Sequence, residues 1–181
     1  MLIAYQFPPV GGAGVQRVAK FTKYLPEHGW DVSVLTVSNP SVPVVDQSLL
    51  AEIPPQTVIR HAKSLEPGYR LKQTLAPTTA AGGASGGWKA GSKRAVKNAA
   101  AVLLQPDPQI LWVPQAIRQG KKLLREMPHH AILVSGPPFS SFLVGAALRR
   151  KSGLPLVLDY RDEWTISNKY WENKSRKPLA E

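Results

Sequence analysis

Cysteine is absent from the 181 residues, and acidic residues are few, with 12 Asp and Glu against 23 Lys and Arg. Without cysteine the chain forms no disulfide, no thiolate metal site and no cysteine nucleophile, a composition that suits a reducing compartment. Long apolar runs that could span a bilayer are also lacking, and the first residues resemble a strand rather than a secretory signal. We therefore expect a cytoplasmic protein, and peripheral attachment to the inner face of the cell membrane remains open.

The excess of positive charge is concentrated in the middle of the chain. Between Arg60 and Arg125, twelve Lys and Arg stand against only Glu66 and Asp107, a net charge of +10 out of the formal +11. Such a block favours anionic partners, namely nucleic acid, anionic lipid or phosphorylated substrates. No recognition helix, zinc finger or RNA-binding sheet motif accompanies the charge, so we do not expect nucleic acid as the partner.

A glycine-rich loop near the start of the chain is the first functional candidate. It follows an apolar run at residues 2–5, precedes a helix-period run at residues 15–25, and contains Gly11, Gly12 and Gly14. Glycine lets the main chain approach a ligand, and the amides at a helix start can face a phosphate. The alternative is a tight turn that packs the helix on its strand, and the loop alone does not decide between them.

The remaining hydrophobic pattern predicts an open, mostly parallel α/β sheet with helices on both faces. Amphipathic helices are expected at residues 15–25 and 113–126, a largely apolar helix at 142–148, and strands at 2–5, 31–37, 57–61, 131–134 and 156–158. Residues 38–55 are rich in proline and are expected to be mostly loop. We expect residues 1–181 to form one domain.

A Gly/Ala-rich insertion at residues 74–91 is expected to be flexible. A basic and partly apolar helix is expected behind it, up to Leu104. This helix either lies at a membrane surface or packs on the domain with its charges in solvent, and both interpretations stay open.

Three polar or glycine-rich segments follow predicted strands and should meet at one edge of the sheet. They are residues 11–14, 135–141 and 159–164. Ligands of open α/β sheets bind outside the carboxyl ends of the strands. The convergence of the three segments favours a ligand-binding function for the glycine-rich loop.

With these segments, the chain resembles the N-terminal half of a GT-B glycosyltransferase of family 4, a family of retaining transferases that use nucleotide sugars. The resemblance lies in Phe7-Pro8-Pro9-Val10-Gly11-Gly12-Ala13-Gly14-Val15-Gln16-Arg17, Lys23-Tyr24-Leu25-Pro26-Glu27-His28-Gly29-Trp30, Ser135-Gly136-Pro137-Pro138-Phe139-Ser140-Ser141 and Asp159-Tyr160-Arg161-Asp162-Glu163-Trp164. It implies a Rossmann-like acceptor-side domain. The donor-binding C-terminal domain is expected to be absent from these 181 residues, so the chain is not expected to be active alone.

The resemblance also implies partners and binding residues. The donor would be a nucleotide sugar, no further cofactor or metal would be needed, and the acceptor would be a glycan or a lipid phosphate. The glycines look like the loop that approaches the donor diphosphate, and residues 135–141 look like the segment that lines the sugar site. The candidate binding residues are Gly11, Gly12, Gly14, Arg17, Ser135, Gly136, Ser140 and Arg161.

Asp159 and Asp162 are the candidate catalytic residues, since an aspartate at the cleft edge can orient an acceptor hydroxyl. The alternative is a salt-bridged strand end or a helix cap. Phe142 stands where many relatives carry a histidine, which argues against a histidine contact to the transferred sugar. The adjacent His129 and His130 lack the spacing of metal ligands, so no metal site is expected.

Two other functions remain as alternatives. A dinucleotide-dependent oxidoreductase would need an acidic residue at the end of the second strand, where Ser38 and Asn39 stand instead. A non-catalytic basic domain that binds anionic lipid or nucleic acid is suggested by charge alone. A sheet edge left open could also promote self-association.

Overall fold

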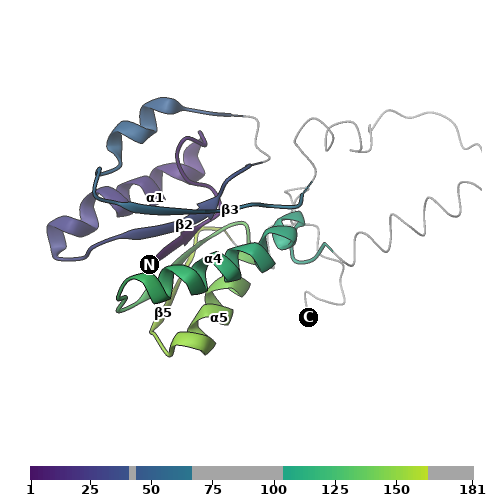
Figure 1. Cartoon of the computed structure of the whole chain (residues 1–181). Coiled ribbons are helices and arrows are strands. Elements are labelled where there is room, and N and C mark those ends of the chain that lie inside the picture. The colour runs from purple at the N-terminus through teal and green to yellow at the C-terminus, as the bar shows by residue number, and fades with distance from the viewer. Residues whose placement is uncertain (41–43, 67–103, 163–181) are drawn as a thin grey trace, which may run out of the picture.

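A computed structural model describes residues 1–40, 44–66 and 104–162, which form a five-stranded, fully parallel sheet in the order β3-β2-β1-β4-β5 (Figure 1). The strands are β1 (Leu2–Ala4), β2 (Ser33–Val37), β3 (Val58–Ala62), β4 (Ile132–Gly136) and β5 (Leu156–Tyr160). The chain runs outward from β1 to β3 and then returns to the other side of β1 with β4. The predicted Rossmann-like α/β class is therefore confirmed.

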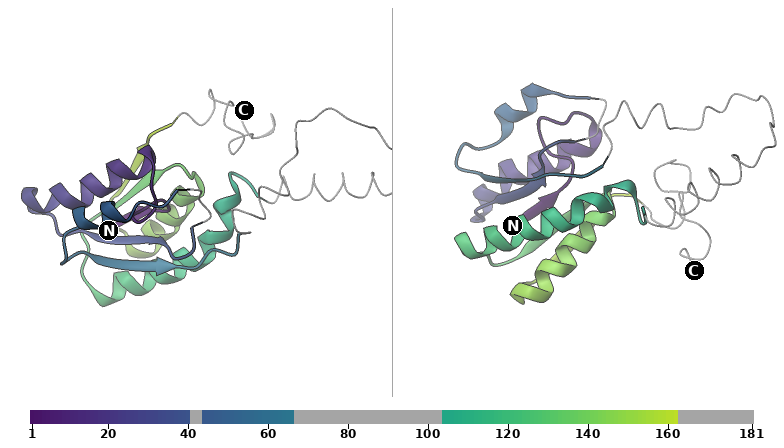
Figure 2. Two further views of the ribbon diagram at one scale, coloured as in Figure 1. Left: turned by 90° about the horizontal axis from the view of Figure 1, so that it is seen from above. Right: turned by 45° about the vertical axis from the view of Figure 1, so that its right-hand side comes forward.

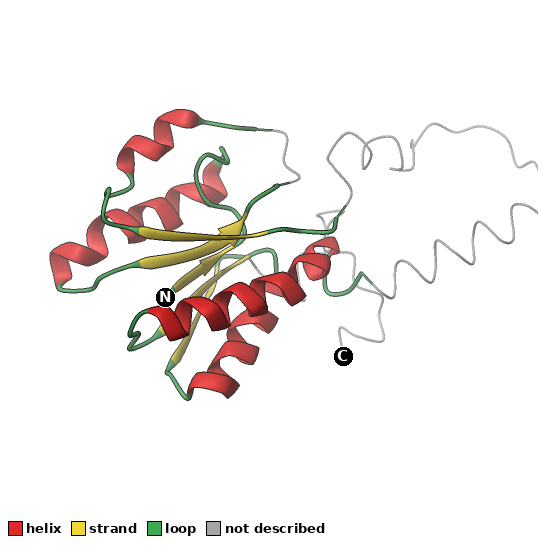
Figure 3. Cartoon of the chain, viewed as in Figure 1, coloured by secondary structure: helices red, strands yellow, loops and turns green. Residues whose placement is uncertain are grey.

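Helices cover both faces of the sheet, as Figures 2 and 3 show. On one face lie α1 (Ala13–Tyr24) and the short 3₁₀ helix η2 (Gln47–Glu52). Glu52 of η2 forms ion pairs with Lys20 and Lys23 of α1. On the other face lie α4 (Val113–Glu126) and α5 (Ser140–Ser152). Two further 3₁₀ turns, η1 (Leu25–His28) and η3 (Pro108–Trp112), follow α1 and precede α4.

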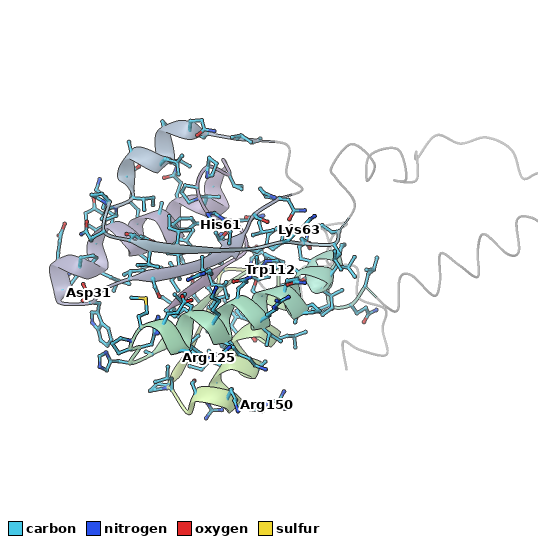
Figure 4. The ribbon with its side chains drawn as sticks, in the orientation of Figure 1. Asp31, His61, Lys63, Trp112, Arg125 and Arg150 are labelled. Carbon is cyan, nitrogen blue, oxygen red and sulfur yellow. The ribbon has the colours of Figure 1, made fainter. Side chains whose placement is uncertain are left out.

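The core has one apolar cluster on each face of the sheet. Successive side chains of a strand point to opposite faces, so Leu2 packs with Val15 of α1 while its neighbour Ile3 belongs to the cluster under α4 and α5. Trp112 is fully buried in that second cluster, where its indole Nε1 donates to the Ala62 carbonyl over 3.1 Å (Figure 4). Central strands buried on both faces explain the continuous apolar runs of the sequence.

Several element bounds differ from those predicted. The α4 helix begins and ends as expected, whereas α5 extends to Ser140 and Ser152, beyond the predicted 142–148. Asp159 and Tyr160 were expected after the last strand but lie within β5, because they pair with Ser135 and Gly136 of β4. The predicted loop at 38–55 contains the helix η2.

The flexible insertion at 74–91 and the basic helix behind it were predicted for a segment that lies outside the described residues. Both therefore stay predictions. Of the helices that the structure describes, none is both long and apolar enough to cross a membrane.

Candidate functional site

The candidate site lies at the carboxyl edge of the sheet, between β1 and β4, where the strand order reverses while the strands stay parallel. The glycine-rich loop leaves β1 here and enters α1, residues 137–139 leave β4 and enter α5, and β5 ends beside them. In open α/β sheets this reversal opens a crevice for ligands. The segments 11–14 and 135–141 therefore meet the third segment at one place as far as Asp162, while residues 163 and 164 lie outside the described residues.

The N-terminus of α1 is open at this edge. Gly12 precedes the helix with φ of 101° and ψ of 167°, a positive-φ conformation that favours glycine, and a Cβ there would meet nothing within 4 Å. No side chain of the described residues caps α1, and its first turn contains no acidic residue. The first amides of a helix need acceptors, and together with the helix dipole they favour an anion. Amides at the α1 N-terminus can thus donate hydrogen bonds to a phosphate oxygen.

At Gly11 and Gly14, neighbouring atoms leave too little space for a Cβ. A Cβ on Gly11 would lie 2.7 Å from Cγ1 of Val44, whose carbonyl accepts from the Gly11 amide over 3.0 Å. A Cβ on Gly14 would lie 2.8 Å from Nη1 of Arg161 and from Oε1 of Gln6. Gly12 is thus the loop glycine whose conformation opens toward solvent, and the ligand contacts proposed for all three stay predictions.

Arg17, Ser135 and Asp159 form a hydrogen-bonded cluster beside the α1 N-terminus. Nη1 of Arg17 donates to Oδ1 of Asp159 over 2.7 Å, and the Ser135 hydroxyl donates to Oδ2 over 2.9 Å. The Asp159 side chain is largely buried, whereas the Arg17 side chain is 52% exposed. Asp159 therefore holds Arg17 at the site while donors of its guanidinium remain in solvent.

Arg161 joins the two loops of the site through backbone carbonyls. Its Nη1 donates to Gly14 O over 2.5 Å, Nη2 to Pro137 O over 2.8 Å and Nε to Gly136 O over 3.1 Å. Burial lowers the pKa of Arg161, while the charges of Asp162 and Asp159 raise it. With three donors used in this way, Arg161 positions the loops, and its predicted role as a substrate ligand remains untested.

Asp107 fixes the start of α5 beneath the site, an assignment that the sequence did not suggest. Its Oδ2 accepts from the backbone amide of Ser140 over 2.9 Å, and the carboxylate is 3% exposed. Burial raises the pKa of Asp107, while hydrogen bonds from Ser140 oppose that shift. Ser140 itself is fully buried. The proposed contact of Ser140 with substrate stays a prediction.

Gly136 ends β4 in close contact with an aromatic cluster. A Cβ at this position would lie 2.7 Å from Cζ of Phe142, whose ring centroid lies 4.3 Å from that of Tyr160. The ring of Phe142 therefore packs against the end of β4. Asp162, in contrast, is exposed, and the general-base role of either aspartate stays a prediction.

The sequence offered little signal for Asp107, a residue of the site that it missed. Asp107 acts on a helix that begins 33 residues later, and such a distant cap has no local pattern. Among the described residues, no group of three or more His, Asp or Glu could hold a metal ion.

No protein-family model matches the chain, and no curated protein matches it. Among solved structures, the chain is similar to Phytolacca americana UGT2 in its complex with UDP-2fluoro-glucose and pterostilbene. The similarity has a TM-score of 0.47 at 14% identity, and it covers 88% of this chain and 30% of the other. It is too weak to assign a family, and this chain spans less than a third of that protein's length.

Proposed function

We propose that this chain is the acceptor-side domain of a GT-B glycosyltransferase of the retaining family 4 type. One observation carries the proposal. The uncapped N-terminus of α1, entered through Gly12, lies at the sheet reversal directly beside the Arg17–Asp159–Ser135 cluster. A helix start and an exposed arginine together suit the diphosphate of a nucleotide sugar.

The proposed reaction joins an acceptor oxygen to the anomeric carbon of the sugar while the bond from that carbon to the nucleoside diphosphate breaks. The α1 amides and Arg17 would stabilise the negative charge that develops on the leaving diphosphate. Asp162 is the better placed of the two aspartates to take the acceptor proton, since it is exposed whereas Asp159 already accepts two hydrogen bonds. A second domain would bind the nucleotide sugar from across the cleft.

The acceptor would be a glycan or a lipid phosphate, as in the synthesis of a surface polysaccharide. The net charge of +10 between Arg60 and Arg125 supports an anionic acceptor or an anionic membrane surface nearby. This proposal places the protein in the cytoplasm, at the inner face of the membrane when it acts.

An oxidoreductase has less support at the same edge. The chain carries Ser38 and Asn39 where a dinucleotide site needs a carboxylate for the ribose. The side-chain amide of Asn39 is also occupied by the backbone of Ser64. Its Nδ2 donates to Ser64 O over 2.9 Å, and its Oδ1 accepts from Ser64 N over 2.7 Å.

Calorimetry tests the proposal with UDP- and GDP-sugars and with NAD, on this chain and on the longest reading frame that contains it. We expect sugar-nucleotide binding by the longer protein and its loss in Gly12→Ala. Gly29→Ala is the matched control, because Gly29 also has positive φ, at 80°, and no atom within 4 Å of a Cβ. Tight NAD binding by this chain alone, or equal effects of the two substitutions, would contradict the proposal.

A further inference from the structure

A pocket of about 490 Å³ lies at the opposite edge of the sheet from the candidate site. Its walls come from the C-terminal turns of α4 and α5 and from the residues that precede β4 and β5, on the face that Figure 3 shows covered by these two helices. Leu124 and Leu154 supply apolar surface, and Lys121, Arg125 and Lys151 supply positive charge. Its volume is within the range of pockets that hold small organic ligands.

The positive charge of this pocket is not neutralised within the described part of the chain. No carboxylate there pairs with Lys121, Arg125 or Lys151, and no Asp or Glu lines the pocket. The nearby Glu126 instead accepts a hydrogen bond from Arg60 and forms an ion pair with Lys122 at 3.7 Å. A ligand in the pocket would therefore meet several cations and no competing anion.

Within the described residues, the last carbonyls of α4 and α5 engage Arg125 but neither of the two pocket lysines. Cations at a helix C-terminus commonly satisfy its last carbonyls, but several of those carbonyls already have donors. In α4, Nε of Arg125 donates to Lys121 O over 3.2 Å. In α5, the Ser152 hydroxyl donates to Leu148 O over 2.9 Å, and the Gly153 amide donates to Arg149 O over 2.8 Å. The ammonium groups of the pocket lysines remain available to a ligand.

His129 forms a fixed and uncharged part of the wall. Its Nδ1 lies 2.9 Å from the Met127 carbonyl, which can only accept, and its Nε2 lies 2.7 Å from the Ser33 hydroxyl. Nδ1 therefore carries the proton, and Nε2 accepts from Ser33. Burial lowers the pKa of His129, which favours the neutral ring. The pocket thus combines a partly apolar wall with exposed cations.

From this combination we infer a second binding site, for a small amphipathic anion that carries one phosphate or carboxylate on a short apolar body. The anionic group lies among Lys121, Arg125 and Lys151, and the apolar body contacts Leu124 and Leu154. Burial of the apolar part and charge-assisted hydrogen bonds to the anion act together. The site is separate from the carboxyl edge and does not depend on the proposed transfer reaction.

Neighbouring residues of the same helices supply matched controls. Lys122 directly follows Lys121 on α4, Arg150 directly precedes Lys151 on α5, and neither control residue lines the pocket. Figure 4 labels Arg125 on α4 and Arg150 on α5. Hexyl phosphate is the probe, titrated into the 181-residue chain and followed by amide chemical shifts. We expect saturable shifts around the pocket, with affinity reduced about tenfold by Lys121→Gln or Lys151→Gln and unchanged by Lys122→Gln or Arg150→Gln.

The inference would be overturned if the pocket and control substitutions weakened the binding of hexyl phosphate equally. It would also be overturned if hexanol or inorganic phosphate bound as tightly as hexyl phosphate, or if no saturable shifts appeared. Sedimentation with vesicles of phosphatidylcholine and phosphatidic acid then separates two sources of the ligand. Suppose the chain pellets with these vesicles, and pelleting is lost when Lys121→Gln and Lys151→Gln are combined but kept when Lys122→Gln and Arg150→Gln are combined. The ligand is then a lipid headgroup with part of its chains. A wild-type chain that stays in solution while it binds hexyl phosphate supports a soluble metabolite.

Discussion

The guanidinium of Arg17 donates from Nη1 to Oδ1 of Asp159 over 2.7 Å, and so joins α1 to β5 across the central reversal of the sheet. The two residues are 142 positions apart in the chain. This contact orients an exposed cation beside the open end of α1. It also links the fold of the domain to the chemistry proposed for its glycine-rich loop.

Removal of the two partners should have unequal effects on stability. Arg17→Gln should lower the free energy of unfolding by less than about 1 kcal/mol, because exposed ion pairs are screened. Asp159→Ala should cost about 1–3 kcal/mol, since it leaves the buried Ser135 hydroxyl without its acceptor. Urea denaturation measures both, and equal costs would show that Asp159 does not organise the cluster.

Arg161→Lys tests the positioning of the two loops. A single ammonium cannot reach the three carbonyls that the guanidinium joins, so we expect a loss of about 2–3 kcal/mol in the free energy of unfolding. The control is Arg149→Lys on the exposed end of α5, which should change stability little. If the two substitutions behave alike in thermal unfolding, Arg161 does not hold the loops.

Gly136→Ala tests the contact between β4 and the aromatic cluster. The new methyl group would lie 2.7 Å from Cζ of Phe142, and overpacking of this kind costs about 1–3 kcal/mol. Phe142→Leu should relieve part of the clash, so the double variant should be more stable than the sum of the single effects allows. Strict additivity in the double-mutant cycle would contradict the packing described here.

The buried carboxylate of Asp107 predicts a specific pH dependence. Burial raises its pKa in the folded state, so the folded protein binds the proton more tightly than the unfolded chain does. The contribution of Asp107 to stability should therefore fall as pH rises from about 4, the ordinary aspartate pKa, through the raised value. Urea denaturation across this pH range measures the free energy of unfolding of wild type and of Asp107→Asn. The difference between the two should change with pH, and a difference that stays constant would refute the prediction.

Self-association is predicted through the edge of the sheet at β5. This strand ends the described sheet, and Val157 is 53% exposed on it. Light scattering should show a mass that rises with concentration in wild type and stays monomeric in Val157→Lys. Val58→Lys on the other edge strand serves as the control, and a wild type that remains monomeric at high concentration removes this prediction.

The sequence predicted the sheet, and the meeting of the polar segments at its carboxyl edge, because both depend on repeated local patterns. The amphipathic period at 113–126 matched α4 residue for residue, and apolar runs marked the buried strands. The start of α5 was missed since Pro138 and two serines resemble a loop, whereas the carboxylate of Asp107 reaches across the fold to hold that turn.

The structural role of each site residue was less predictable from the sequence. Arg161 and Asp159 resembled exposed polar residues at a cleft edge, but their partners lie in segments distant in sequence, at Gly14 and Arg17. Likewise, the glycine pattern did not separate Gly11, which packs against Val44, from Gly12, whose positive φ opens the helix start. Tertiary contacts decide such roles.

The most direct test of the central claim is an amide chemical-shift titration of the chain with UDP and GDP, a method that detects weak binding. Binding at the α1 N-terminus should shift the amides of Gly12, Ala13 and Gly14 first, and Gly12→Ala should remove these shifts while Gly29→Ala retains them. Shifts confined to Ser38 and Asn39, or none in the glycine-rich loop, would contradict the proposed diphosphate site.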